Sequence, residues 1–106
     1  MEMKRVTIEE IKNSVIPYGK TYDLAKIVLF GSFARQDETE SSDIDLLIDA
    51  ECSDFTLFDL SGMRLDLKEK LGRKVDIVTS AGLDEKVKKN VMEDEIILYE
   101  REKSEH

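Results

Sequence analysis

The chain has 106 residues, of which 41% are hydrophobic, and it carries a formal net charge of −8 at pH 7. This length predicts one domain over residues 1–106 with a single modest core. The acidic excess argues against direct binding of nucleic acid, which generally needs a basic surface, and suits a basic protein partner or a metal-bridged phosphate ligand. No apolar run approaches the roughly 20 residues of a membrane span. The N-terminus lacks a signal-peptide core, so we expect a cytoplasmic protein without membrane contact.

Hydrophobic periodicity and turn residues predict eight elements that alternate between helices and strands. In chain order, these are a helix over 7–16, a strand over 24–30, a short helix over 33–36, a strand over 43–48, a helix over 55–71, a strand over 75–78, a helix over 83–91 and a strand over 95–99. This order favours an α/β or α+β fold in which a sheet packs on helices. The segment from residue 101 onward is expected to be a frayed tail.

Side-chain chemistry sets several of the expected boundaries. Thr7, followed three residues later by a glutamate, has the form of a capping box, and the helix that it starts is expected to end near Pro17. Asp54 is expected to cap the long central helix, and Gly62 within it to mark a close packing contact. Cys52 is the single cysteine, which excludes an internal disulfide and favours a buried spectator. The apolar face of the central helix is expected to contain Leu57, Leu60, Met63, Leu67 and Leu71.

Two carboxylates lie in one apolar strand. Asp43 and Asp45 are two residues apart, so their side chains are expected to project from the same face of the strand. Carboxylates this close repel each other unless a cation intervenes, and Mg²⁺ prefers carboxylate, phosphate and water oxygens. Asp76 interrupts another apolar strand, where an unpaired charge is costly. The three carboxylates together are therefore predicted to be catalytic metal ligands, with room for two Mg²⁺ ions of the kind used in phosphoryl displacement.

A glycine–serine turn precedes these carboxylates in the chain. A strand that runs through such a turn into a helix N-terminus offers free backbone N–H groups to a phosphate, and we expect Gly31 and Ser32 to have this role. Ser32 could also cap the short helix. Arg35 could reach the same phosphates or brace the following loop against a carboxylate. Each feature alone is also typical of an ordinary turn or a solvent-facing strand, but their combination favours a site for phosphate and metal.

The motif resembles that of a known enzyme family. Gly31-Ser32, ten intervening residues and then Asp43-Ile44-Asp45 closely resemble the signature of the polymerase-β-type nucleotidyltransferase superfamily. The wider string GSFAR…SDIDLLID, followed by LGRKVDIVT and DEIILYE, is similar to its minimal nucleotidyltransferase branch. The resemblance implies a mixed sheet of about four strands and Mg²⁺-dependent transfer from a nucleoside triphosphate with release of pyrophosphate. It also implies that the glycine and serine hold the triphosphate, that both aspartates bind metal, and that Asp76 is the third carboxylate.

The resemblance further implies a biological setting. Family members of this size are typically antitoxins paired with a helical HEPN-domain toxin, and they transfer AMP from ATP to a tyrosine of that ribonuclease. From a length of 106 residues we expect no second domain that could enclose an acceptor, which suits an acceptor presented by a partner. Two alternatives stay open. One is an antitoxin that neutralises its partner by binding alone, and the other is nucleotidyl transfer to a small molecule such as an aminoglycoside.

Overall fold

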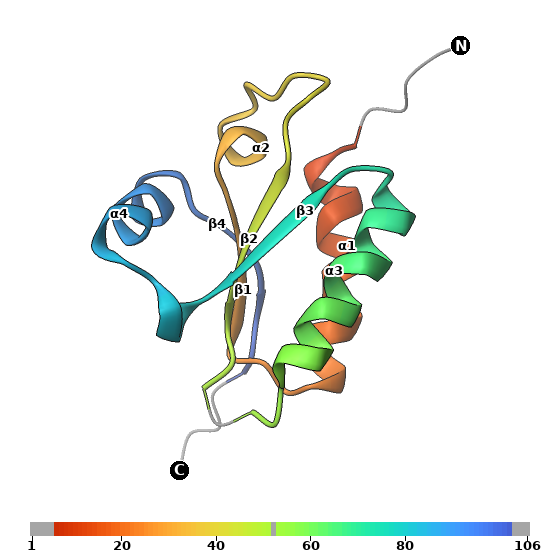
Figure 1. Ribbon diagram of the computed structural model, residues 1–106, viewed down its shortest axis with the longest axis vertical. Helices are drawn as coiled ribbons and strands as arrows, with labels where there is room; N and C mark the ends of the chain where they lie inside the picture. The colour runs from red at the N-terminus through yellow and green to blue at the C-terminus, as the bar shows by residue number, and fades with distance from the viewer. Residues whose placement is uncertain (1–5, 52, 103–106) are drawn as a thin grey trace.

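A computed structural model describes residues 6–51 and 53–102 of the chain. In chain order, its elements are α1 (Ile8–Thr21), β1 (Lys26–Phe30), α2 (Ser32–Arg35), β2 (Ile44–Asp49), α3 (Leu57–Leu71), β3 (Val75–Thr79), the 3-10 turn η1 (Ser80–Gly82), α4 (Glu85–Asp94) and β4 (Ile96–Glu100) (Figure 1). The eight predicted elements are all present, with boundaries that shift by a few residues. Only η1 was not expected. Within the described residues, no helix is both long and apolar enough to cross a membrane.

The four strands form one mixed sheet in the order β3-β2-β1-β4. β1 pairs antiparallel with both β2 and β4, whereas β2 and β3 are parallel. Helices α1 and α3 lie together on one face of the sheet, and α4 lies on the opposite side (Figure 1). This arrangement confirms the α+β class and the mixed four-stranded sheet expected from the sequence.

The main core lies between the sheet and the α1–α3 layer. β2 alternates strictly between buried and partly buried residues, so its isoleucines and leucine at the buried positions enter the core while the aspartates face the other side. Burial of such side chains contributes about 1.5–3 kcal/mol each. The fully buried members of the core include Ile11, Val15, Leu24, Ile27, Leu29, Phe33, Ile44, Leu46, Ile48, Met63 and Leu67.

Pro17 does not end α1, contrary to the expectation. The helix continues to Thr21, although proline lacks an N–H and removes one hydrogen bond from a helix interior. Tertiary contacts hold this last part in place. Gly19 is buried so close to the ring of Tyr99 that a Cβ there would lie 2.4 Å from Cδ2 of the ring, and the hydroxyl of Tyr18 donates to Asp66 of α3. Packing therefore overrides the local signal to end the helix.

The start of α3 also differs from the expectation. Thr56, rather than Asp54, is the N-cap, and it forms a reciprocal capping box in which Asp59 N donates to Thr56 Oγ1 (3.2 Å) and Thr56 N donates to Asp59 Oδ2 (2.9 Å). The close contact expected at Gly62 is wrong, because a Cβ there would meet only open space. Leu57 is 80% exposed, since it lies at the margin of the stripe whose buried members are Met63, Leu67 and Leu71.

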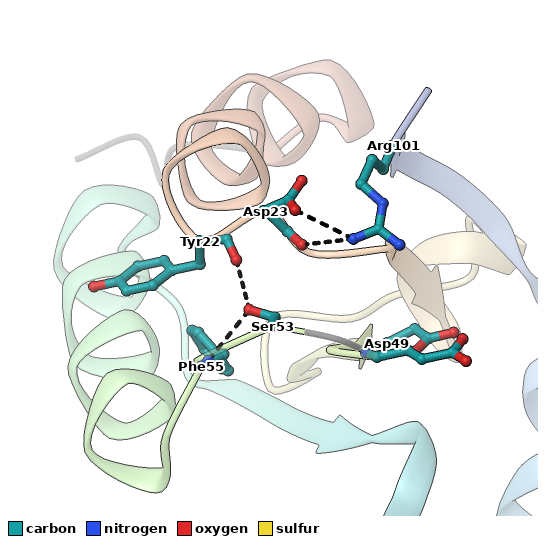
Figure 2. Close-up of polar contacts among 7 residues, drawn as sticks. Tyr22, Asp23, Asp49, Ser53, Phe55 and Arg101 are labelled. Carbon is teal, nitrogen blue, oxygen red and sulfur yellow. Dashed lines mark hydrogen bonds and ion pairs between the residues drawn. The ribbon is translucent and has the colours of Figure 1, made fainter. Parts of the chain in front are cut away.

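The end of the sheet nearest the C-terminus is held by polar contacts (Figure 2). The Ser53 hydroxyl donates to the carbonyl of Tyr22 (2.5 Å) and accepts from the N–H of Phe55 (3.2 Å). Arg101 Nη1 donates to the carbonyl of Asp23 (3.1 Å) and lies 3.4 Å from its carboxylate. The tail is therefore anchored at residue 101, which corrects the expectation that it frays from there. The prediction for Cys52 and the tail beyond residue 102 fall outside the described residues.

Candidate active site

The turn after β1 forms one half of the candidate site. Gly31 is the N-cap of α2, and its φ of 78° lies in the region that favours glycine. A Cβ at this position would lie 2.4 Å from Oδ2 of Asp45. Glycine is therefore required twice, once for the turn and once for the approach of the carboxylate. Ser32 is the first residue of α2 rather than its cap, and it is partly buried beside the same turn.

The carboxylates on β2 and β3 form the other half. Asp43 comes directly before β2, and Asp45 lies within it, on the face opposite the main core. In the parallel pairing of β2 with β3, Asp45 is in register with Asp76. On its other side, Asp45 faces Phe30, the last residue of β1 before the glycine turn. The fold thus brings the three predicted acidic residues and the glycine–serine turn to one end of adjacent strands.

Negative charge is only partly compensated at this end of the sheet. The pKa of Asp45 is raised from 3.8 to about 6, first by burial and then by the negative charges of Asp76 and Asp43. The positive charge of Arg35 acts in the opposite direction and offsets only part of the rise. Groups whose pKa is shifted by burial together with neighbouring charges are typical of functional sites.

Two basic residues contact the carboxylates around this site. Arg35 donates from Nη1 to Asp94 of α4 (2.7 Å) and from Nε to Asp37 (3.1 Å). Arg35 was expected either to reach the phosphates or to brace the loop against a carboxylate, and the structure shows the contacts of the second role. Lys74 Nζ lies 3.8 Å from Asp43 Oδ2 in a largely exposed ion pair, which is worth little in stability. The ion pairs of Lys74 with Asp43 and of Arg35 with Asp94 were not predicted. In the sequence, only the positions of Lys74 just before β3 and of Asp94 at the end of α4 could have pointed to them.

The donor set suits a hard divalent cation in chemistry and charge. Carboxylate oxygens are the ligands that Mg²⁺ prefers. The pKa of Asp45 is raised by burial first and then by repulsion from Asp76 and Asp43, and a bound cation would relieve that repulsion. Within residues 6–51 and 53–102, however, no three acidic, histidine or cysteine side chains already converge as a metal-binding group. Asp43, Asp45 and Asp76 thus share one end of the sheet without surrounding a single point. They fit a metal that organises them as it binds.

Comparison with protein-family models matches residues 13–104 to the family described as polymerase beta, nucleotidyltransferase. The chain belongs to this family. The match extends from α1 past the end of β4, and it therefore contains both halves of the site. This confirms the resemblance that the glycine–serine turn and the paired aspartates indicated.

Similar proteins carry names from the same class of enzyme. The chain is 30% identical over 94 residues to the protein adenylyltransferase MntA of Thermococcus cleftensis, with 85% of this chain and 94% of the relative covered. It is 31% identical over 91 residues to a Methanocaldococcus jannaschii protein with a provisional protein adenylyltransferase name, covering 86% and 97%. Together with the family match, these names show that the chain is a nucleotidyltransferase.

Solved structures share the fold. A toxin–antitoxin crystal structure with AMP-PNP superposes with a TM-score of 0.72 at 22% identity, over 84% of this chain and 73% of the other. A complex of a tri-AMPylated Shewanella oneidensis HEPN toxin with its MNT antitoxin gives a TM-score of 0.65 at 21% identity, over 84% and 69%. At this level of identity, the likeness establishes a common architecture for the sheet that carries the site.

Proposed function

We propose that this chain is a Mg²⁺-dependent protein adenylyltransferase that transfers AMP from ATP to a tyrosine hydroxyl of a HEPN-domain toxin and thereby acts as its antitoxin. The observation that carries the proposal is the register of Asp45 with Asp76 beside Gly31, which puts negative charge and a glycine turn at one end of the sheet. The adenylyltransferase name of the Thermococcus relative supports AMP as the transferred group.

Each residue of the site has a distinct part in the proposed reaction. The backbone at Gly31 and the hydroxyl of Ser32 hold the triphosphate, with its α-phosphorus toward β2. Asp43, Asp45 and Asp76 are the residues that would hold Mg²⁺. When bound, the metal supplies charge neutralisation for the phosphates and favours ionisation of the attacking hydroxyl. A tyrosine hydroxyl has a pKa near 10, so this ionisation is otherwise unfavourable at neutral pH.

The transfer itself exchanges one phosphorus–oxygen bond for another. The tyrosine oxygen attacks the α-phosphorus of ATP in line, the bond to the bridging oxygen of the β-phosphate breaks, and pyrophosphate leaves. In this proposal Asp76, which the edge strand β3 contributes, accepts the hydroxyl proton. Positioning and charge neutralisation provide most of the rate enhancement in such reactions.

The choice of a protein acceptor is supported by the open Asp45 face of the described residues and by the structural neighbours. The described residues form one sheet with its helices, and the structure contains no second layer over the Asp45 face beyond α4. A neighbour with the same fold is an MNT antitoxin in complex with a tri-AMPylated HEPN toxin. An acceptor tyrosine carried by a helical partner therefore fits this site better than a small molecule that needs an enclosing domain.

The test is transfer of AMP to a HEPN-domain protein, with one encoded beside this chain as the first choice. Wild-type protein is mixed with that partner, ATP and Mg²⁺, and intact mass and peptide sequencing locate any added AMP. We expect one or more AMP groups on a partner tyrosine, and loss of transfer by at least about 100-fold in the double variant Asp43→Asn, Asp45→Asn. Asp49→Asn is the matched control, because Asp49 ends the same strand and its side chain accepts from Glu51 N (3.1 Å).

Three results would contradict the proposal. If the double variant protects cells from the partner as well as the wild type does, binding alone explains neutralisation. If the purified protein consumes ATP with an aminoglycoside and no partner present, the acceptor is a small molecule. If AMP is found on a serine or threonine of the partner, the acceptor chemistry proposed here is wrong.

A further inference from the structure

We infer that Arg73, in the turn between α3 and β3, is a positioning residue that holds the loop of residues 36–42 and braces α2, and thereby supports the phosphate-binding turn beside the carboxylates. The loop begins after α2, which follows Gly31, and it ends at Asp43. The β1–β2 pairing, in which Phe30 faces Asp45, sets the distance between the two halves of the site, and the loop bears on them through α2 at one end and Asp43 at the other. The catalytic consequence of this inference rests on the proposed function, whereas the structural part does not.

The loop lies over a cavity and has little apolar packing of its own. The cavity has a volume of about 790 Å³ and lies between the loop and the C-terminal end of α3. Residues 35–37 and 39–41 are exposed, and the loop projects beyond the end of the sheet (Figure 1). The cavity wall includes Phe33, Glu38 and Thr39 on one side and Leu71 and Arg73 on the other. Hydrophobic burial therefore contributes little to the position of the loop.

Arg73 crosses this gap with three contacts. Its Nη2 donates to the carbonyl of Thr39 (3.0 Å), and its Nη1 donates to the carbonyl of Glu40. Its guanidinium carbon lies 5.2 Å from the centre of the Phe33 ring, within the range of a cation–π contact. Phe33 is only 1% exposed and directly follows Ser32. One side chain thus contacts both the start of the phosphate-binding helix and the middle of the loop.

The loop's remaining hydrogen bonds are local. Among the residues that the structure describes, Asp37 N donates to the carbonyl of Ser32 (3.0 Å), and Thr39 N donates to the Ser42 hydroxyl (2.8 Å). Ser42 N donates to the carbonyl of Thr39 (3.1 Å). These bonds shape the loop internally but do not join it to α3 or β3. The link to that part of the fold is made by the Arg73 side chain.

The backbone around Arg73 is itself tied to the metal strands. Lys74, the next residue, accepts a hydrogen bond at its carbonyl from Ile44 N (2.9 Å), where the pairing of β2 with β3 begins. Asp76 follows two residues later. Arg73 is therefore fixed relative to Asp76 by its own backbone and relative to Ser32 by its side chain. Arg73 thus braces α2 and the loop against the start of β3.

Only arginine can make these contacts together. Its planar fork presents separate N–H groups to two carbonyls while its face stacks on an aromatic ring. Lysine keeps the charge, but its compact ammonium group has neither the two separated nitrogen donors nor the planar face that arginine presents to the carbonyls and the Phe33 ring. The buried Nε of Arg73 has no hydrogen-bond partner within the described residues, so the two carbonyls and the ring are the contacts that define its position.

The first test measures the loop directly in the full chain. Amide hydrogen exchange is recorded for Asp37, Thr39 and Ser42 in the wild type, in Arg73→Lys and Arg73→Ala, and in the control Arg64→Ala, which removes an exposed arginine from α3. We expect exchange of these three amides to accelerate at least about tenfold in both Arg73 variants while amides of β1 and β2 keep their protection. Wild-type exchange at the loop in either Arg73 variant would overturn the inference.

The second test measures the consequence for the site. Affinity for ATP with Mg²⁺ is measured by calorimetry, and transfer to the partner is measured at varied ATP. We expect Arg73→Lys to weaken nucleotide affinity about tenfold and to raise the KM for ATP more than it lowers kcat, with Arg64→Ala unchanged. A loosened loop with wild-type nucleotide affinity would show that Arg73 has only a structural role. If the wild type itself binds no nucleotide, the proposed function fails, and the exchange measurement still decides whether Arg73 holds the loop.

Discussion

Replacing Asp45 with asparagine is expected to stabilise the protein while abolishing transfer. The pKa of Asp45 rises from 3.8 to about 6 on folding, because burial and the charges of Asp76 and Asp43 disfavour its ionised form. This rise corresponds to about 3 kcal/mol of lost stability at neutral pH. Solvent screening at this partly exposed carboxylate reduces the expected effect to about 1–2 kcal/mol. Asparagine keeps the shape without the charge, so the melting temperature at about pH 7.5 should rise by roughly 5–10 °C.

The stability gained by Asp45→Asn should depend on pH, because it comes from removing an ionised carboxylate. The folded state binds the Asp45 proton more tightly than the unfolded state does, so the penalty is fully present above about pH 6 and disappears as the pH falls toward 3.8. Thermal melts of wild type and Asp45→Asn should therefore differ at about pH 7.5 and nearly coincide at about pH 3.5. Asp49→Asn, on the same strand, should shift the melting temperature little at either pH. An equal difference at both pH values, or a destabilised Asp45→Asn at neutral pH, would refute this account of the site.

Two further predictions use matched glycine pairs. Gly31→Ala and Gly72→Ala both place alanine at a positive φ, 78° and 67°, but only at Gly31 does the new Cβ approach the Asp45 carboxylate, at 2.4 Å. Both should lose about 1 kcal/mol by thermal melting, and only Gly31→Ala should also lose binding of ATP with Mg²⁺; equal binding by the two variants would contradict the role given to the glycine turn. Gly62→Ala faces open space inside α3 and should gain about 0.5–1 kcal/mol, whereas Gly19→Ala must displace the Tyr99 ring and should lose at least about 1 kcal/mol. A destabilised Gly62→Ala would show that α3 is packed more tightly there than the structure indicates.

Much of the fold could be predicted because local patterns and tertiary packing agree along most of the chain. The alternation in β2 specified which face carries Asp45, and the structure has Ile44, Leu46 and Ile48 buried as this pattern requires. The parallel pairing of β2 with β3 was not readable from residue patterns alone. The resemblance to the nucleotidyltransferase family implied a mixed sheet, and the structure contains one. Local periodicity states which residues are buried but not which strand lies beside which.

The failures occur where a distant contact decides the outcome. Pro17 and Gly19 are strong local signals to end a helix, yet α1 continues because its last turn packs on Tyr99. Arg73 reads in the sequence as an ordinary turn residue, since its partners Thr39 and Glu40 lie far away in the chain. Arg35 could be assigned two roles from its spacing, and only the position of α4 selects its contact with Asp94. In each case, the missing information is which side chain or helix lies across the gap.

The parallel pairing of β2 with β3 also determines when the site can form during folding. The antiparallel β1–β2 pair brings Gly31 and Asp45 together through a short connection, whereas Asp45 meets Asp76 only after the whole of α3 has crossed over the sheet. Long connections of this kind close late, because their closure costs chain entropy before any stabilising contact between their ends forms. A partly folded chain can therefore have the turn proposed to receive phosphate but lack the complete acidic set. Under the proposed function, nucleotide affinity is therefore a property of the finished fold, and a chain that is still folding should not retain ATP or act on a partner.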